Sequence, residues 1–159
     1  MISDPIALAT LGGGIAQAGG LIGSSWGIGI AGAAGAAMLS QERGQMRNVI
    51  ILASLPMTQA FYGLITMILV LSRVIPNLAA TPNAGGSGFA VFALGIMAGL
   101  TFAIAGAYLG SVCSSGIAFL SKTHGGILTN SIMLAVFVEL ISVLALVFSI
   151  MALSMLGLM

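Results

Sequence analysis

Long apolar stretches separated by short polar connections make up almost the whole chain. The apolar segments cover residues 8–39, 49–75, 89–120 and 127–158. Each is longer than the roughly 20 residues that an α-helix needs to cross a bilayer. None shows the alternation of a barrel strand, and unpaired backbone groups are not tolerated in hydrocarbon. The pattern therefore predicts an all-α membrane protein with four transmembrane helices.

Small residues recur at every fourth position in the first and third apolar segments. The first has Gly19, Gly23, Gly27, Ala31 and Gly35, and the third has Gly95, Gly99, Ala103, Ala107, Ser111 and Ser115. Small residues at this spacing let helix backbones approach closely, and such packing drives helix association in lipid. Glycine is also common in membrane helices in general. Two long stripes nevertheless favour narrow inner helices in a crowded circular assembly.

The two halves of the chain resemble each other. Sliding the sequence along itself places Gly14 on Gly95 and Gly29 on Gly110, and "NVIILA" on "NSIMLA". Beyond that point, a short insertion places Gln59 opposite Glu139. The repeat predicts two tandem-duplicated helical hairpins in the same orientation, residues 1–79 and residues 80–159.

Composition and charge agree with a membrane protein. Hydrophobic residues make up 59% of the 159 positions and charged residues 4%, whereas roughly a quarter of residues are charged in soluble domains. The connections at 40–48 and 121–126 carry Arg43, Arg47 and Lys122, and the middle connection carries Arg73. Basic residues favour the cytoplasmic side. We therefore expect those two connections in the cytoplasm and both termini outside.

Few residues suggest catalysis. The lone cysteine, Cys113, is interpreted as a packing residue, and the lone histidine, His124, as a surface residue without a partner for a metal. The sequence has neither a phosphate-binding loop nor a nucleophile with a paired histidine, so ATP hydrolysis is not expected on this chain. We expect no cofactor and no nucleic-acid partner.

One carboxylate lies inside an apolar run. Glu139 stands in "AVFVELISVLALV", residues 135–147. A charged side chain at the bilayer centre costs about 2.5–3.5 kcal/mol on insertion scales. Without a bound cation, Glu139 is therefore expected to be neutral much of the time. An acid in such a place is a functional-site hypothesis by default.

Polar groups for such a site are found in "LPMTQAFYG", residues 55–63. Thr58 and Gln59 lie four and three residues before Tyr62, which places the three side chains on one helical face. Pro56 lacks an N–H and pushes away the turn before it, so we expect it to free backbone carbonyls near Leu52 and Leu55. Such oxygen atoms suit a hard cation or a shared proton. Hydrogen bonding between helices is the alternative interpretation of these residues.

In these features the chain resembles the proteolipid ring subunit, called K or c, of rotary V-type (V/A-type) ATPases. The resemblance rests on the four helices, the duplicated hairpins, the glycine-rich odd helices, and "LPMTQAFYG", which is similar to the family's LPxTQxxYG. It implies that Glu139 carries a transported ion. The implied pocket consists of Leu55 (through its carbonyl), Thr58, Gln59 and Tyr62.

The resemblance also implies an assembly. Identical copies would form a rotor ring in membrane lipid, beside a static membrane subunit with an essential arginine. A cytoplasmic central-stalk subunit would contact the polar connections, and partner subunits would hydrolyse ATP. A prokaryotic cell membrane is the expected location.

The identity of the ion depends on one departure from the family. Sodium-transporting members have a glutamine on the third helix where this chain has Leu109. The absence of this glutamine favours the proton over sodium as the transported ion, because a carboxyl group can hold a proton covalently. Sodium stays open because the remaining ligands are those of a sodium site, and Ser111 or Ser114 could substitute through water. More distant alternatives are a small proton-coupled secondary transporter and a purely structural assembly protein.

Overall fold

The computed structural model describes residues 4–81 and 85–159. Residues 1–3 of the predicted first hairpin and 82–84 of the middle connection lie outside the described residues. Four helical spans in the described chain are long and apolar enough to cross a membrane: Pro5–Leu39, Arg43–Ala80, Gly86–Ala118 and Leu128–Met155. The prediction of four transmembrane helices is confirmed. The boundary between residues 79 and 80 stays a prediction.

The first span is one uninterrupted helix, α1, Pro5–Leu39. It begins three residues before the predicted start, because Asp4 caps it. The Asp4 carboxylate accepts the Ile6 N–H at 3.0 Å, and Pro5 occupies the first turn, where its missing N–H has no cost.

The second span was predicted as one helix over 49–75, but it is longer and irregular. Its successive elements are η1 Arg43–Gln45, α2 Met46–Ser54, η2 Leu55–Met57, α3 Thr58–Leu69, the π-helical η3 Val70–Val74, and α4 Ile75–Ala80. Both interruptions accompany prolines. Pro56 lies within the tight turn η2, and Pro76 follows the wide turn η3. A proline removes a helical hydrogen bond, so the neighbouring turns tighten or widen.

The second half contains two long helices, α5 Gly85–Ala118 and α6 Leu128–Met155. The prediction carried α6 to residue 158, but it ends earlier because Gly157 adopts a φ of 68°. The Leu158 N–H then bonds the Leu153 carbonyl at 3.1 Å, and the Gly157 N–H bonds the Ser154 carbonyl at 3.0 Å. This is the Schellman arrangement, which ends a helix by reversing the chain.

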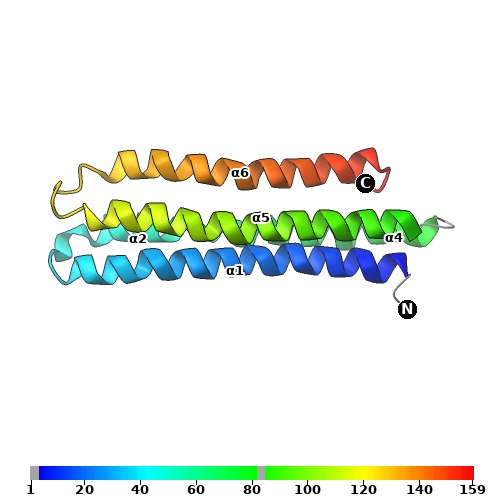
Figure 1. Cartoon of the computed structure of the whole chain (residues 1–159), viewed down its shortest axis with the longest axis horizontal. Coiled ribbons are helices and arrows are strands. Elements are labelled where there is room, and N and C mark those ends of the chain that lie inside the picture. Colours follow the sequence, from blue (N-terminus) through cyan, green and yellow to red (C-terminus); the bar gives the residue numbers. More distant parts are fainter. Residues whose placement is uncertain (1–3, 82–84) are drawn as a thin grey trace.

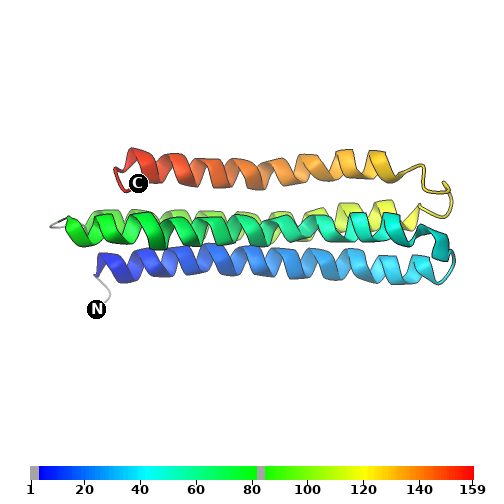
Figure 2. The ribbon, with the colours of Figure 1, turned by 180° about the vertical axis from the view of Figure 1, so that it is seen from behind.

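The helices lie side by side in one elongated bundle (Figure 1). Both described ends of the chain lie at one end of the bundle, and the connections that follow α1 and α5 lie at the other. Figure 2 shows the same arrangement from behind, with the second span alongside α1. The two hairpins therefore run in the same direction, as the repeat predicts.

Helices α1 and α5 approach each other more closely than side chains would allow. A Cβ atom added to Gly19 would overlap the backbone of Gly99, and one added to Gly110 would overlap the backbone of Gly27. The first-segment stripe is therefore confirmed as a packing face. Gly35, at its far end, meets Val49 of α2 instead.

The stripe predicted on α5 is only partly used. Gly95 and Gly99 pack on α1, but Ser111 and Ser115 are exposed, and Gly106 and Gly110 take their place in the contact. The reason is geometric. A helix has 3.6 residues per turn, so a strict spacing of four drifts around the helix surface.

Candidate ion-binding site

Glu139 projects from α6 toward the second span. The Tyr62 hydroxyl donates a hydrogen bond of 2.9 Å to Glu139 Oε1, joining residues that lie 77 positions apart. Glu139 and Tyr62 are each half-buried. The Tyr62 ring packs at a tilt against Phe102, with 6.1 Å between the ring centroids. Phe102 of α5 is fully buried, and its ring contact limits the movement of the Tyr62 ring.

The turn η2 presents the other predicted residues. Thr58 Oγ1 donates to the Leu55 carbonyl at 3.1 Å, and the Thr58 backbone N–H bonds the same oxygen. The expectation of a bare Leu55 carbonyl is therefore wrong, because the tight turn brings Thr58 onto it.

Gln59 is fully buried beside this turn. Its Nε2 lies 3.5 Å from Thr58 Oγ1, and its Oε1 has no hydrogen-bond partner among the described residues. A buried oxygen without a donor costs about 1–3 kcal/mol. An arriving proton donor or cation would remove that cost. The structure thus joins Tyr62 directly to Glu139, while Thr58, one turn earlier on the same span, contacts Leu55 and Gln59.

Two serines near this region were not predicted. Ser24 of α1 is buried, and its hydroxyl bonds the Pro56 carbonyl and the Ala60 N–H. Ser142, three residues after Glu139 on α6, is fully buried, and its Oγ has no partner in the described part of the chain. A serine in a glycine-rich membrane helix resembles any small packing residue. The spacing of Ser142 from Glu139 was the one signal available.

The third helix contributes apolar packing at this level. Leu109 and Cys113 are fully buried in one hydrophobic cluster, so the interpretation of Cys113 as a packing residue is confirmed. Ser114 is half-buried.

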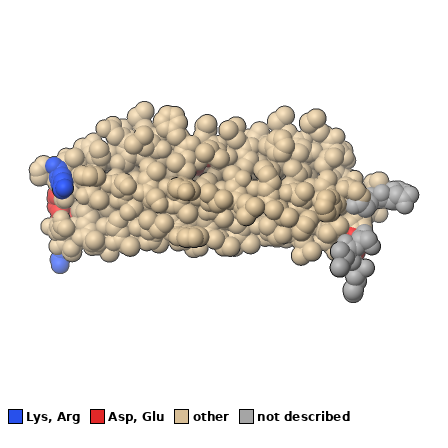
Figure 3. Space-filling view, in the orientation of Figure 1, with Lys and Arg blue, Asp and Glu red and all other residues tan. Residues whose placement is uncertain are grey.

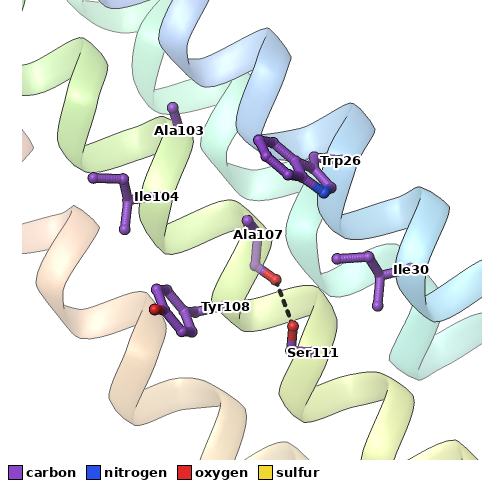
Figure 4. Close-up of a pocket in the computed structure, with 7 residues that line it drawn as sticks. All are labelled: Trp26, Ile30, Ala103, Ile104, Ala107, Tyr108 and Ser111. Atoms are coloured by element: carbon purple, nitrogen blue, oxygen red, sulfur yellow. Dashed lines mark hydrogen bonds between the residues drawn. The ribbon is translucent and has the colours of Figure 1, made fainter.

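Ser111, the other suggested substitute ligand, lies on an exposed face of α5. It donates to the Ala107 carbonyl at 3.1 Å, and lines an open hollow of about 380 Å³ together with Trp26 and Tyr108 (Figure 4). The suggestion that Ser111 or Ser114 supplies the missing oxygen through water stays a prediction.

Part of the chain is similar to a known protein family. Residues 7–70 match the family described as the C subunit of ATP synthase. Most of the first hairpin is therefore similar to that family. The match includes the turn η2 with Thr58, Gln59 and Tyr62, whereas Glu139 lies beyond it.

A curated relative extends the comparison. The chain is 35% identical over 97 residues to the A-type ATP synthase subunit K of Methanocaldococcus jannaschii. The similarity covers 61% of this chain and 40% of that protein, so the match spans less than half the length of the relative. With its four apolar helical spans, the chain is an integral multi-pass membrane protein, and part of it is similar to the c and K subunits of ATP synthases.

Proposed function

We propose that this chain is an ion-carrying rotor-ring subunit in the membrane sector of a V/A-type ATPase. The observation that carries the proposal is the hydrogen bond between Tyr62 and Glu139. The sequence has three acidic residues, and Glu139 is the one that lies within a membrane span. It meets the polar turn of the very segment that matches the ATP synthase family.

The mechanism follows from the cost of charge in lipid. A loaded, neutralised Glu139 can pass through hydrocarbon as the ring turns, whereas a charged one costs about 2.5–3.5 kcal/mol. The ring therefore moves only when each site is loaded or faces the static subunit with its arginine. Rotation and ion transfer are coupled in this way. ATP hydrolysis takes place on partner subunits.

The proposed ion is the proton. Leu109 offers no oxygen where the resemblance implies a third-helix glutamine, and the Ser111 hydroxyl is already bonded to the Ala107 carbonyl of its own helix. A carboxyl group needs no full ligand cage to hold a proton. Sodium is the second candidate, because the buried Oε1 of Gln59, which has no partner among the described residues, is an oxygen that a cation would satisfy.

The ion assignment has a direct test. Carbodiimides modify neutral carboxyl groups, so a sodium ion bound at Glu139 protects it. We expect sodium at constant pH to leave labelling of Glu139 unchanged. Protection at millimolar sodium would instead establish sodium as the ion.

The proposed orientation places the connections at 40–48 and 121–126 toward the central stalk in the cytoplasm. The charged side chains visible in Figure 3 gather at the two ends of the bundle and leave the middle of this face free of charge. The two connections are in contact, since a Cβ on Gly125 would meet the side chains of Asn48 and Gln45. They therefore offer a joint polar surface to a stalk subunit.

The central test replaces the acid. Glu139→Gln keeps the size of the side chain but carries no titratable proton. We expect the variant to assemble into rings that neither pump nor react with a carbodiimide. Asp4→Asn, at the end of the bundle away from the connections at 40–48 and 121–126, is the matched control; asparagine also caps a helix, so this variant should pump normally. A Glu139→Gln ring that still pumps would refute the proposal. Ion-driven exchange without the ATPase partners would favour a secondary transporter.

A further inference from the structure

Ser24 connects α1 to the turn that carries the candidate ligands. Its Oγ donates to the Pro56 carbonyl at 2.8 Å and accepts the Ala60 N–H at 2.8 Å. In a regular α-helix, the carbonyl of one residue bonds the N–H four residues later. Pro56 and Ala60 are such a pair. The hydroxyl of another helix therefore stands between two groups that a regular helix would join directly.

Two glycines of α1 fit the same turn on either side of Ser24. A Cβ on Gly20 would overlap the Gln59 carbonyl, and one on Gly27 would overlap the Pro56 ring. Positions 20, 24 and 27 follow the helical repeat, so they form one face of α1. The turn at Pro56 thus packs directly on the backbone of α1, and Ser24 makes the polar contact between the two glycines.

Close packing against α5 on another face of α1 fixes the position of α1 relative to the turn. Gly19 and Gly23 bring α1 against the backbone of α5 at Gly99 and Phe102. Phe102 is also the residue that supports the Tyr62 ring. The α1–α5 pair therefore holds both the turn with Gln59 and the tyrosine that bonds Glu139.

We propose that Ser24 is a positioning residue of the ion site, an inference that rests on the proposed function. Its hydroxyl holds the turn open, so that Thr58 and Gln59 keep their places beside the Tyr62–Glu139 bond. Without the hydroxyl, the Pro56 carbonyl and the Ala60 N–H bond each other directly. The turn then closes, and the Gln59 side chain moves relative to Glu139.

The test compares two neighbouring serines. Ser24→Ala removes the inserted hydroxyl. Ser25→Ala is the matched control, because Ser25 is exposed and its hydroxyl bonds carbonyls of its own helix. The readout is the rate of carbodiimide labelling at Glu139 in the assembled protein at fixed pH, with and without sodium. We expect Ser24→Ala to change this rate, or the protecting sodium concentration, by about three- to tenfold. Ser25→Ala should match the wild type.

A second variant covers failure of the first to fold. Ser24→Cys keeps a group of similar shape with a weaker donor and acceptor, and we expect it to shift labelling in the same direction. Wild-type labelling in either assembled Ser24 variant would overturn the positioning role alone. Absence of labelling at Glu139 in the wild-type protein would instead contradict the proposed function, so the two failures can be told apart.

Discussion

At the scale of single residues, removing the Tyr62 hydroxyl measures what its hydrogen bond to Glu139 contributes to ion binding. Tyr62→Phe removes the 2.9 Å hydrogen bond to Glu139 and keeps the ring against Phe102. Hydrogen bonds to charged groups contribute about 1.5–3 kcal/mol, which corresponds to tenfold or more in affinity. Because the bond stabilises the charged carboxylate, its loss favours the neutral acid, so for a proton we expect binding at Glu139 to strengthen about tenfold and carbodiimide labelling to persist to higher pH. An unchanged affinity would show that the bond does not stabilise the charged carboxylate.

Two buried serines should respond oppositely to replacement by alanine. The Ser24 hydroxyl both donates and accepts a hydrogen bond, whereas the Ser142 hydroxyl has no partner among the described residues. Removing an unpartnered buried polar group can be neutral or stabilising, whereas removing the bonded Ser24 hydroxyl costs two hydrogen bonds and forces the turn at Pro56 to rearrange. We expect Ser142→Ala to leave stability unchanged or raise it by up to about 1 kcal/mol, and Ser24→Ala to lower it by about 1 kcal/mol or more. Thermal unfolding in detergent measures both, and equal losses would contradict the assignment.

The sequence predicted the candidate site unevenly at this scale. Glu139 and Tyr62 were predictable because charge and polarity in an apolar run are costly and therefore conspicuous. Ser24 was not, because its importance comes from lying opposite Pro56, a contact between residues 32 positions apart. The Leu55 carbonyl was mispredicted because Pro56 reveals a lost hydrogen bond without showing which group replaces it.

At the scale of helices, the α1–α5 contact leaves no room for a methyl group. A Cβ on Gly19 would overlap the Gly99 backbone, whereas none of the described residues lies near a Cβ on Gly29. Overpacking costs about 1–3 kcal/mol, and alanine in an open helical position gains about 0.5–1 kcal/mol over glycine. We expect Gly19→Ala to destabilise the detergent-solubilised chain and Gly29→Ala to leave it intact or stabilise it. Equal thermal midpoints for the two variants would contradict this packing.

The number and course of the helices could be predicted, but their irregularities could not. Apolar length set the four spans, and that signal is unambiguous in a membrane protein. The π-helical turn at Val70–Val74 depends on how the chain adapts to Pro76, which several backbone arrangements can do. The packing face of α5 was only partly predicted, because residues spaced exactly four apart drift around a helix that has 3.6 residues per turn.

At the scale of the whole molecule, the duplication leaves equivalent residues in different surroundings. Gly95 packs on Gly12 of α1 and Gly110 on Gly27, but their repeat counterparts Gly14 and Gly29 face open space in the part of the chain that the structure describes. This is what two like hairpins joined head to tail require, since no further hairpin among the described residues lies against the outer edge of the first. Head-to-tail contacts of this kind close into rings when further copies are added at a closing rotation. The repeat thus supports the proposed ring by an argument that does not depend on Glu139.

The duplication also sets how many ions a ring can move. Glu139 is the one acid within the described spans, so there is one proposed ion site for four helices, and its counterpart in the first hairpin is Gln59. A ring of given girth then moves half as many ions per turn as one with an acid on each hairpin. Moving one charge against 100 mV costs about 2.3 kcal/mol, so fewer ions per ATP allow each ATP to act against a steeper gradient. This favours a pump over a synthase.

The ratio of ions to ATP tests that direction. In vesicles containing the complete ATPase, we expect pumping to continue against a potential about twice that which stops an enzyme with an acid on each hairpin, since the work per ion and the number of ions trade off directly. The measurement is the potential at which net pumping reverses at a fixed ATP supply. Vesicles with the Glu139→Gln subunit provide the baseline for passive leak. A reversal potential no higher than that of the enzyme with twice the acids would show that the missing carboxylate in the first hairpin does not set the direction of transport.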